Sequence, residues 1–188
     1  MTEPSPAWRP GCDTHGTVGR PEEGVAAPSD AASIFEAFRS SPDMARQGEV
    51  DSEPSARRYI SWATRDDSRA FVVDVGGGVA AFVGLDVDRG NRSAWMYYWG
   101  HPRYRGRGLV KQLARAVADW ALQDEGADGA GLERLELGHR VNNPASGAIA
   151  LAAGFVQEGR ERAKFLVDGE RIDVLTYGRL RSDGKEGT

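Results

Sequence analysis

The segment from Arg103 to Val110 has the residue types and spacing best suited to binding an anion. It reads Arg-Tyr-Arg-Gly-Arg-Gly-Leu-Val and follows a β-rich run that ends near Gly100. An apolar stripe with helical spacing begins at Leu109, so the segment leads into the N-terminus of a helix. The first N–H groups of a helix have no intrahelical partner, and the helix dipole adds partial positive charge there. Because the glycines also allow close approach of the main chain, the segment predicts a diphosphate site.

The competing interpretation is a basic loop that only connects a strand to a helix. The segment is not a Walker loop, because no Gly-x4-Gly-Lys-Ser/Thr occurs, and it lacks the dinucleotide fingerprint Gly-x-Gly-x-x-Gly. A second glycine cluster, Gly76 to Gly78, precedes another β-rich run and has no lysine partner. We therefore predict a hairpin turn there rather than a phosphate loop.

Four polar side chains downstream could bind a ligand or transfer protons. Glu136 lies in a short β-rich run, His139 follows it, and Asn143 and Ser146 begin a further helix. Partial burial can bring a carboxylate toward neutrality, and imidazole titrates near a pH of about 6.5. Each side chain has a simpler alternative role. Glu136 could face solvent, His139 could be an ordinary loop residue, and the other two could serve only the first turn of their helix.

Hydrophobic periodicity gives the elements that must position these groups. Helices are expected at 31–39, 53–65, 109–121 and 145–153, and strands at 70–75, 79–87, 93–99, 132–137, 155–167 and 171–180. Ser29 and Asp30 are expected to cap the first helix, Gly154 to end the last, and Asp168-Gly169 to turn the final hairpin. The order of elements predicts a single α/β domain.

The chain has 188 residues, which is room for one domain and a tail. The segment 1–28 holds five of the nine prolines and few large apolar groups, so we expect a flexible N-terminal tail there, a domain at 29–181 and a C-terminal tail at 182–188. Thr17 to Pro21 could add a short edge strand. Cys12 and His15 could ligate a metal, but two ligands in a flexible segment do not close a tetrahedral site, so we expect no metal.

Charge and cysteine content exclude several classes of protein. With 24 Lys+Arg against 28 Asp+Glu the net charge is -4, so neither nucleic acid nor an anionic membrane is an expected partner. A single cysteine excludes an internal disulfide framework, and no apolar run or N-terminal pattern predicts a membrane span or secretion. We expect a cytoplasmic protein, monomeric or homodimeric.

The basic loop and the downstream helix together carry a family resemblance. Arg105 to Val110 matches the pattern Arg/Gln-x-x-Gly-x-Gly/Ala except that Val110 replaces the final small residue, and Asn143 to Ser146 with Gly154-Phe155 forms a second signature one helix and one strand later. Both resemble the GNAT superfamily of acetyl-CoA-dependent N-acetyltransferases. The resemblance covers about residues 29 to 181.

Smaller motifs resemble one branch of that superfamily, the ribosomal-protein alanine/serine N-acetyltransferases. They are the Tyr98-Trp99-x-x-Pro lead-in, the Leu135-Glu136-Leu137 strand, Asn143-x-x-Ser146, Glu158-Gly159 after Gly154-Phe155, Asp30 ahead of its helix, and Asp43-Met44 after Pro42. The resemblance to this branch does not identify the acceptor amine of the protein. Candidates are a protein N-terminus and a small amine.

The resemblance implies a mixed, mostly antiparallel sheet of about six to seven strands flanked by about four helices. It also implies acetyl-CoA as cosubstrate and direct attack by a primary amine in a ternary complex. The residues that it assigns to acetyl-CoA are the main chain of Tyr98, Trp99 and Gly100, the loop residues Arg105, Gly106, Arg107, Gly108, Leu109 and Val110, and Asn143.

For proton transfer the resemblance leaves a choice. Glu136 or His139 is the expected base, and Ser146 is the expected acid because Ala150 stands where many members have a tyrosine. That missing tyrosine motivates an alternative, a GNAT-fold module that binds acyl-CoA as a sensor or partner without turnover.

Overall fold

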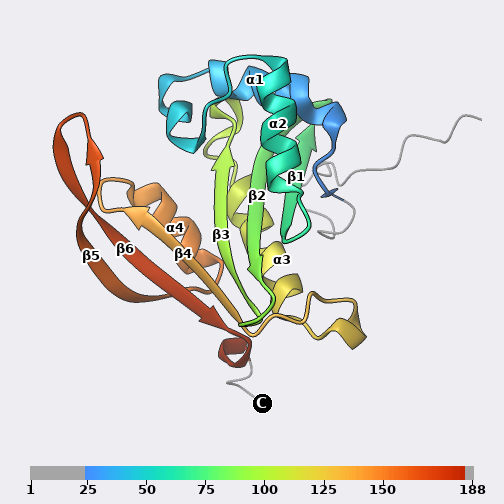
Figure 1. Ribbon diagram of the computed structural model, residues 1–188, viewed down its shortest axis with the longest axis vertical. Helices are drawn as coiled ribbons and strands as arrows, with labels where there is room; N and C mark the ends of the chain where they lie inside the picture. Colours follow the sequence, from blue (N-terminus) through green and yellow to red (C-terminus); the bar gives the residue numbers. More distant parts are fainter. Residues whose placement is uncertain (1–23, 185–188) are drawn as a thin grey trace, which may run out of the picture.

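A six-stranded sheet forms the centre of the computed structural model, which describes residues 24–184 (Figure 1). Its strands are β1 Ser68–Val75, β2 Gly78–Asp88, β3 Ser93–Gly100, β4 Arg134–Arg140, β5 Val156–Val167 and β6 Glu170–Leu180. Their spatial order is β1-β2-β3-β4-β6-β5. Every neighbouring pair is antiparallel except β3 and β4, which are parallel. The prediction of a mixed, mostly antiparallel sheet is confirmed.

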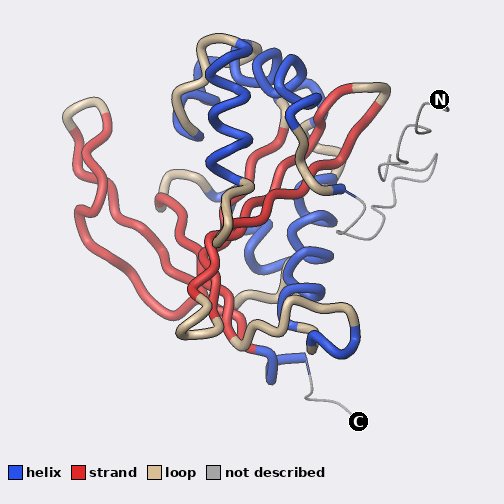
Figure 2. Tube along the Cα trace, turned by 45° about the vertical axis from the view of Figure 1, so that its right-hand side comes forward, coloured by secondary structure: helices blue, strands red, loops and turns tan. Residues whose placement is uncertain are grey.

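Helices cover both faces of the sheet (Figure 2). They are α1 Ala31–Arg39 and α2 Glu53–Ala63 on one face, and α3 Leu109–Leu122 and α4 Pro144–Ala152 on the other. Strand alternation explains the two cores, since Val72 packs with the α1 and α2 residues whereas Val73 packs with those of α3. Because both faces are covered, the centre of β2 is an unbroken apolar run. None of the helices within residues 24–184 is long and apolar enough to cross a membrane.

The parallel pair β3 and β4 separates after a short stretch of pairing. Ser93–Trp95 pairs with Arg134–Glu136, and beyond these residues the two strands diverge (Figure 1). The His101 N–H donates to the Ala80 carbonyl of β2. Since main-chain groups alternate along a strand, those of Tyr98 and Gly100 point to the other side, into the gap. The divergence therefore leaves strand-like hydrogen-bonding groups for a ligand.

The start of α3 depends on two glycines in left-handed conformations. Gly106 has a φ of 79° and Gly108 a φ of 75°, and Gly108 is the N-cap residue of the helix. L side chains rarely adopt this conformation, so the loop requires glycine at both positions. The helix begins at Leu109, as the apolar stripe predicted.

The beginning of the chain differs from the prediction in two ways. The Asp30 carboxylate does not cap α1 but accepts a hydrogen bond from the Ala27 N–H at 2.8 Å. Val25 forms a β-bridge with Phe71, so the chain joins the sheet before Ser29, where we expected the domain to start. Most of the expected tail, with Cys12, His15 and the strand at Thr17 to Pro21, lies outside the described residues.

The fourth strand is displaced from its predicted range of 132–137. Pairing of Gly138 with Thr176 and of His139 with Leu175 on β6 extends β4 to Arg140. The sequence pattern stopped at Gly138 because glycine weakens a strand signal, but a neighbouring strand overrides that propensity. His139 is consequently a buried strand residue, and its interpretation as a loop residue was wrong.

Candidate active site

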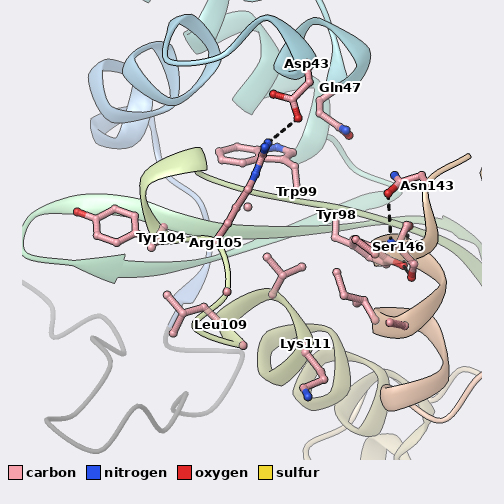
Figure 3. A pocket seen from close by; sticks show the side chains of 18 of the residues that line it. Asp43, Gln47, Tyr98, Trp99, Tyr104, Arg105, Leu109, Lys111, Asn143 and Ser146 are labelled. Carbon is pink, nitrogen blue, oxygen red and sulfur yellow. Dashed lines mark hydrogen bonds and ion pairs between the residues drawn. The ribbon is translucent and has the colours of Figure 1, made fainter.

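A cavity of about 540 Å³ opens where β3 ends (Figure 3). Its walls are the end of β3, the glycine loop, the first turns of α3 and α4, and the 3-10 segment Pro42–Gln47. The residues predicted to bind a cofactor or react that line it are Tyr98, Trp99, Gly100, Arg105, Gly106, Gly108, Leu109, Val110, Asn143 and Ser146. Residues far apart in the sequence thus share one cavity.

The sequence reasoning missed other residues of this wall. Asp43, Met44 and Gln47 come from the 3-10 segment, and Lys111 comes from the first turn of α3. Lys111 could have been found, because a cation one turn into a helix behind a glycine loop suits a phosphate. Asp43 and Met44 belong to the motifs that resemble the ribosomal-protein branch, but nothing in the local pattern of these two residues or of Gln47 indicates that Pro42–Gln47 packs over the loop.

Arg105 crosses the cavity to meet Asp43, and Figure 3 shows this ion pair as a dashed line. The Nη2 to Oδ2 distance is 2.8 Å, and Nη2 also lies 3.6 Å from Met44 Sδ. A hydrogen bond from the Ser41 hydroxyl, together with Arg105, holds the pKa of the Asp43 carboxyl below its ordinary value. An anion that binds to Arg105 must therefore compete with a carboxylate.

The other two loop arginines point elsewhere. The guanidinium carbons of Arg103 and Arg107 lie 5.7 and 5.3 Å from the ring centroid of Tyr104, whose hydroxyl donates to the Val75 carbonyl. Arg107 is not part of the cavity wall. Of the predicted arginine cluster, only Arg105 reaches the cavity.

Tyr98 and Ser146 join β3 to α4 across the cavity. The Tyr98 hydroxyl donates to the Ser146 carbonyl at 2.8 Å and accepts a hydrogen bond from Ser146 Oγ at 3.1 Å. Burial raises the pKa of Tyr98 to about 12, so the phenol keeps its proton at neutral pH. The Asn143 Oδ1 accepts from the Ser146 N–H and caps α4, as predicted. Hydrogen bonds therefore hold Ser146 through its main-chain N–H, its carbonyl oxygen and its hydroxyl.

Val110 occupies space that Gly100 leaves open. A Cβ added to Gly100 would lie 2.7 Å from Val110 Cγ2, which is closer than real Cβ contacts. The departure from the GNAT loop pattern at Val110 is therefore accommodated by a glycine on the neighbouring strand.

Glu136 and His139, the two predicted base candidates, do not line the cavity. Glu136 Oε1 accepts from Arg134 Nε at 2.8 Å, and Arg134 also pairs with Glu158. Glu136 lies opposite Trp95, where β3 and β4 still pair. The structure thus places this carboxylate in an ion-pair cluster, at a distance along the sheet from Ser146.

His139 is buried against Tyr177 on the α4 side of the sheet. Nδ1 lies 2.9 Å from the Arg140 carbonyl, and Nε2 lies 3.2 Å from the Tyr177 hydroxyl. A carbonyl can only accept, so Nδ1 carries a proton, and Nε2 shares a hydrogen bond with the Tyr177 hydroxyl, which also lies 3.5 Å from Gln157 Oε1. Both ring nitrogens are occupied. Among the described residues, no cluster of three or more His, Cys, Asp or Glu side chains could hold a metal ion.

Two curated proteins show similarity in sequence. The ribosomal-protein-serine acetyltransferase of Escherichia coli (strain K12) is 34% identical over 92 residues, 48% of each chain. YdaF of Bacillus subtilis (strain 168), which carries a provisional name as a ribosomal N-acetyltransferase, is 26% identical over 98 residues, 52% of this chain and 51% of that protein. The chain spans about half the length of these curated relatives.

Solved structures share the fold at low sequence identity. The RimL ribosomal L7/L12 alpha-N-protein acetyltransferase in complex with coenzyme A has a TM-score of 0.73 at 19% identity, covering 84% of this chain and 92% of that one. A chimera of the spermidine N-acetyltransferase SpeG from Vibrio cholerae has a TM-score of 0.72 at 20% identity, with 87% and 96% covered. The acetyltransferase MccE, solved with acetyl-CoA and AMP, has a TM-score of 0.68 at 20% identity, with 82% and 88% covered.

Residues 25–156 match one protein family, which is described as the acetyltransferase (GNAT) domain. This range contains the parallel strand pair β3 and β4, the glycine loop and the whole of α4. The chain belongs to the GNAT acetyltransferase domain family.

Proposed function

We propose that the protein is an acetyl-CoA-dependent N-acetyltransferase that transfers the acetyl group to a primary amine. The observation that carries this proposal is the joint position of the β3–β4 gap and the glycine loop on one cavity. Family membership supports it, as do related structures solved in complex with coenzyme A or acetyl-CoA. The single cysteine and this cosubstrate suit a cytoplasmic location.

The cavity fits the two polar parts of acetyl-CoA. The diphosphate would lie on the glycine loop, where Gly106 and Gly108 expose main-chain N–H groups at the start of α3 and Lys111 adds a positive charge. The amides of the pantetheine arm would pair with main-chain groups of Tyr98 and Gly100, as a short extra strand, with Asn143 beside them. No covalent enzyme intermediate is needed.

In the proposed reaction the amine nitrogen attacks the thioester carbonyl, the new C–N bond forms and the C–S bond breaks. The departing sulfur leaves as a thiolate and takes up one proton. We assign the transfer of this proton to Ser146 Oγ, which would turn its hydrogen from Tyr98 toward the sulfur and take up a proton from solvent in the same step, so that the serine is never left ionised. Burial raises the pKa of Tyr98 to about 12, and a serine hydroxyl is a still weaker acid than a phenol, so neither group stays ionised at neutral pH and solvent supplies the net proton.

The attacking amine must lose a proton before it reacts. We propose that water takes this proton, since Arg134 holds the Glu136 carboxylate and both His139 nitrogens have partners. The activity should then rise with pH along the titration of the acceptor itself. A profile of kcat/KM against pH tests this proposal, because an α-amine with a pKa of about 8 and a lysine side chain with a pKa of about 10.4 should give different limbs. The alternative result is a limb of the pH profile whose apparent pKa stays the same when the acceptor amine is changed. If that limb disappears in Glu136→Gln or His139→Ala, the substituted residue is the base.

The competing candidate is a module that binds acyl-CoA without turnover. The observation that favours it is Ala150, buried where many members have a tyrosine. Thiol release from acetyl-CoA with a panel of amines separates the two functions. Calorimetric binding of acetyl-CoA with no amine-dependent thiol release would support the module and contradict the enzyme.

A further inference from the structure

A second, wider cleft of about 740 Å³ adjoins the cavity across the open end of the β3–β4 gap. One wall is the segment Ser41 to Arg46, and the other is formed by Arg140 at the end of β4 and by Leu166 to Asp168 at the β5–β6 turn. The two recesses share two lining residues, Asp43 and Arg105. The Asp43–Arg105 ion pair is therefore a common wall between them, and the cleft adjoins the cavity in which acetyl-CoA would lie.

Positive charge exceeds negative charge along this cleft. Its ionisable lining consists of Arg46, Arg105 and Arg140 against Asp43 and Asp168. Asp43 neutralises Arg105, which leaves Arg46 and Arg140 against Asp168. Neither of these two arginines has a carboxylate within ion-pair distance among residues 24–184.

The two arginines lie on opposite walls. Arg46 comes from the N-terminal half of the chain, and the Arg140 guanidinium is held 5.1 Å from the ring centroid of Phe165 on the hairpin. A planar guanidinium held against a ring keeps its N–H groups free for a carboxylate. A chain that passes between the walls would meet a guanidinium on each side.

We propose that this cleft binds an acidic peptide, whose N-terminal amine is the acceptor and whose carboxylates at the following positions contact Arg46 and Arg140. This inference rests on the proposed function and names its substrate class. The cleft volume suits several residues rather than a single small amine. A polycationic amine would instead meet two unpaired guanidiniums, so such amines are excluded as efficient acceptors.

The test compares three peptides that share one N-terminal residue and one C-terminal part but carry Glu, Gln or Lys at the three positions after the first. Thiol release from acetyl-CoA is measured for each peptide and for spermidine. We expect kcat/KM for the Glu peptide to exceed that for the Lys peptide at least tenfold, and to fall as salt is added. Equal or better use of the Lys peptide or of spermidine would overturn the inference.

The double variant Arg46→Glu/Arg140→Glu locates the effect in the cleft. It should reverse the order of the Glu and Lys peptides and leave acetyl-CoA affinity unchanged. The charge-matched control is Arg39→Glu/Arg58→Glu, two exposed residues of α1 and α2 that line neither recess, and it should keep the original order. Weaker acetyl-CoA binding in the cleft variant would assign the arginines to the cosubstrate and contradict the proposal.

The two proposals fail in different ways. If no peptide or amine supports thiol release, the N-acetyltransferase function fails. If release occurs but does not depend on peptide charge, the function stands and the acidic-peptide cleft is wrong.

Discussion

The Tyr98 hydroxyl gives its single proton to the Ser146 carbonyl and therefore accepts, rather than donates, in its contact with Ser146 Oγ. This pair of hydrogen bonds joins the diverging strand β3 to the first turn of α4. It holds the first turn of α4 against β3 and directs the Ser146 hydroxyl toward Tyr98.

Removing either hydroxyl of this pair should slow turnover more than it weakens acetyl-CoA binding. We expect Ser146→Ala to lower kcat about 100-fold, as for a lost proton donor. Tyr98→Phe should lower kcat about fivefold, since one hydrogen bond contributes about 1 kcal/mol. The double variant should be no worse than Ser146→Ala, because Tyr98 acts through Ser146. Steady-state kinetics on the three variants measure this.

Tyr97→Phe is the matched control. The Tyr97 hydroxyl is buried and has no hydrogen-bond partner among the described residues, so its removal should leave kcat and stability unchanged or slightly improved. If Tyr98→Phe behaves like Tyr97→Phe, the positioning role of Tyr98 is wrong.

Asp43→Asn should strengthen acetyl-CoA binding. The variant removes the carboxylate that occupies Arg105, and an exposed ion pair contributes up to about 1 kcal/mol, so the gain is up to about fivefold. Arg105→Gln should weaken binding, whereas Arg107→Gln, whose guanidinium lies over Tyr104, should have a smaller effect. Calorimetric titration with acetyl-CoA measures the affinity of each variant. A larger loss of affinity in Arg107→Gln than in Arg105→Gln would refute the assignment of Arg105 to acetyl-CoA binding.

Gly100→Ala should destabilise the fold through a clash with Val110. The added Cβ would lie 2.7 Å from Val110 Cγ2, and overpacking of this kind costs about 1–3 kcal/mol. Gly100→Ala/Val110→Ala should recover most of the free energy of unfolding, because the smaller side chain removes the clash. Denaturant unfolding of the single and double variants measures their free energies of unfolding. If the double variant loses the sum of the two single-variant losses, the proposed clash with Val110 is contradicted.

Stability should fall at alkaline pH through three partly buried tyrosines, Tyr59, Tyr97 and Tyr98. Burial raises the pKa of Tyr98 to about 12, and it also raises the pKa values of Tyr59 and Tyr97. A phenol with a raised pKa in the folded state contributes stability that is fully present below its unfolded pKa of about 10 and is lost above it. Absorbance of tyrosinate and circular dichroism should change together above that pH. Ionisation of these phenols near pH 10 in the folded protein would disagree with their burial.

Much of the fold was predictable because it depends on local patterns. The stripe from Leu109 predicted α3, and Ala31 to Arg39 is α1 as expected. The glycine loop was predictable for the same reason, since Gly106 and Gly108 lie next to the helix that they serve. The turn at Asp168-Gly169 also followed from the residues that favour a positive φ.

The parts that sequence could not predict depend on contacts between distant segments. The local sequence shows a loop arginine at Arg105, and its partner Asp43 becomes visible only when the 3-10 segment packs over the loop. The choice between Glu136 and His139 was a choice about geometry. Pairing of β4 with β6 buries His139, and Arg134 forms an ion pair with Glu136. Neither contact can be recognised from the local hydrophobic periodicity of the sequence.

The central claim is most directly tested by amine-dependent thiol release from acetyl-CoA, measured for the full chain and for Gly108→Glu. The variant places a carboxylate at the start of α3, where the diphosphate would lie, and should lose at least about 100-fold in acetyl-CoA affinity, or ~2.7 kcal/mol. Gly108→Ala carries the same backbone strain at a φ of 75° without the charge and separates the two effects. We predict amine-dependent release in the native chain, a modest loss in Gly108→Ala and near-background release in Gly108→Glu. Release that is equal in all three proteins, or absent from the native chain while acetyl-CoA still binds, would contradict the account.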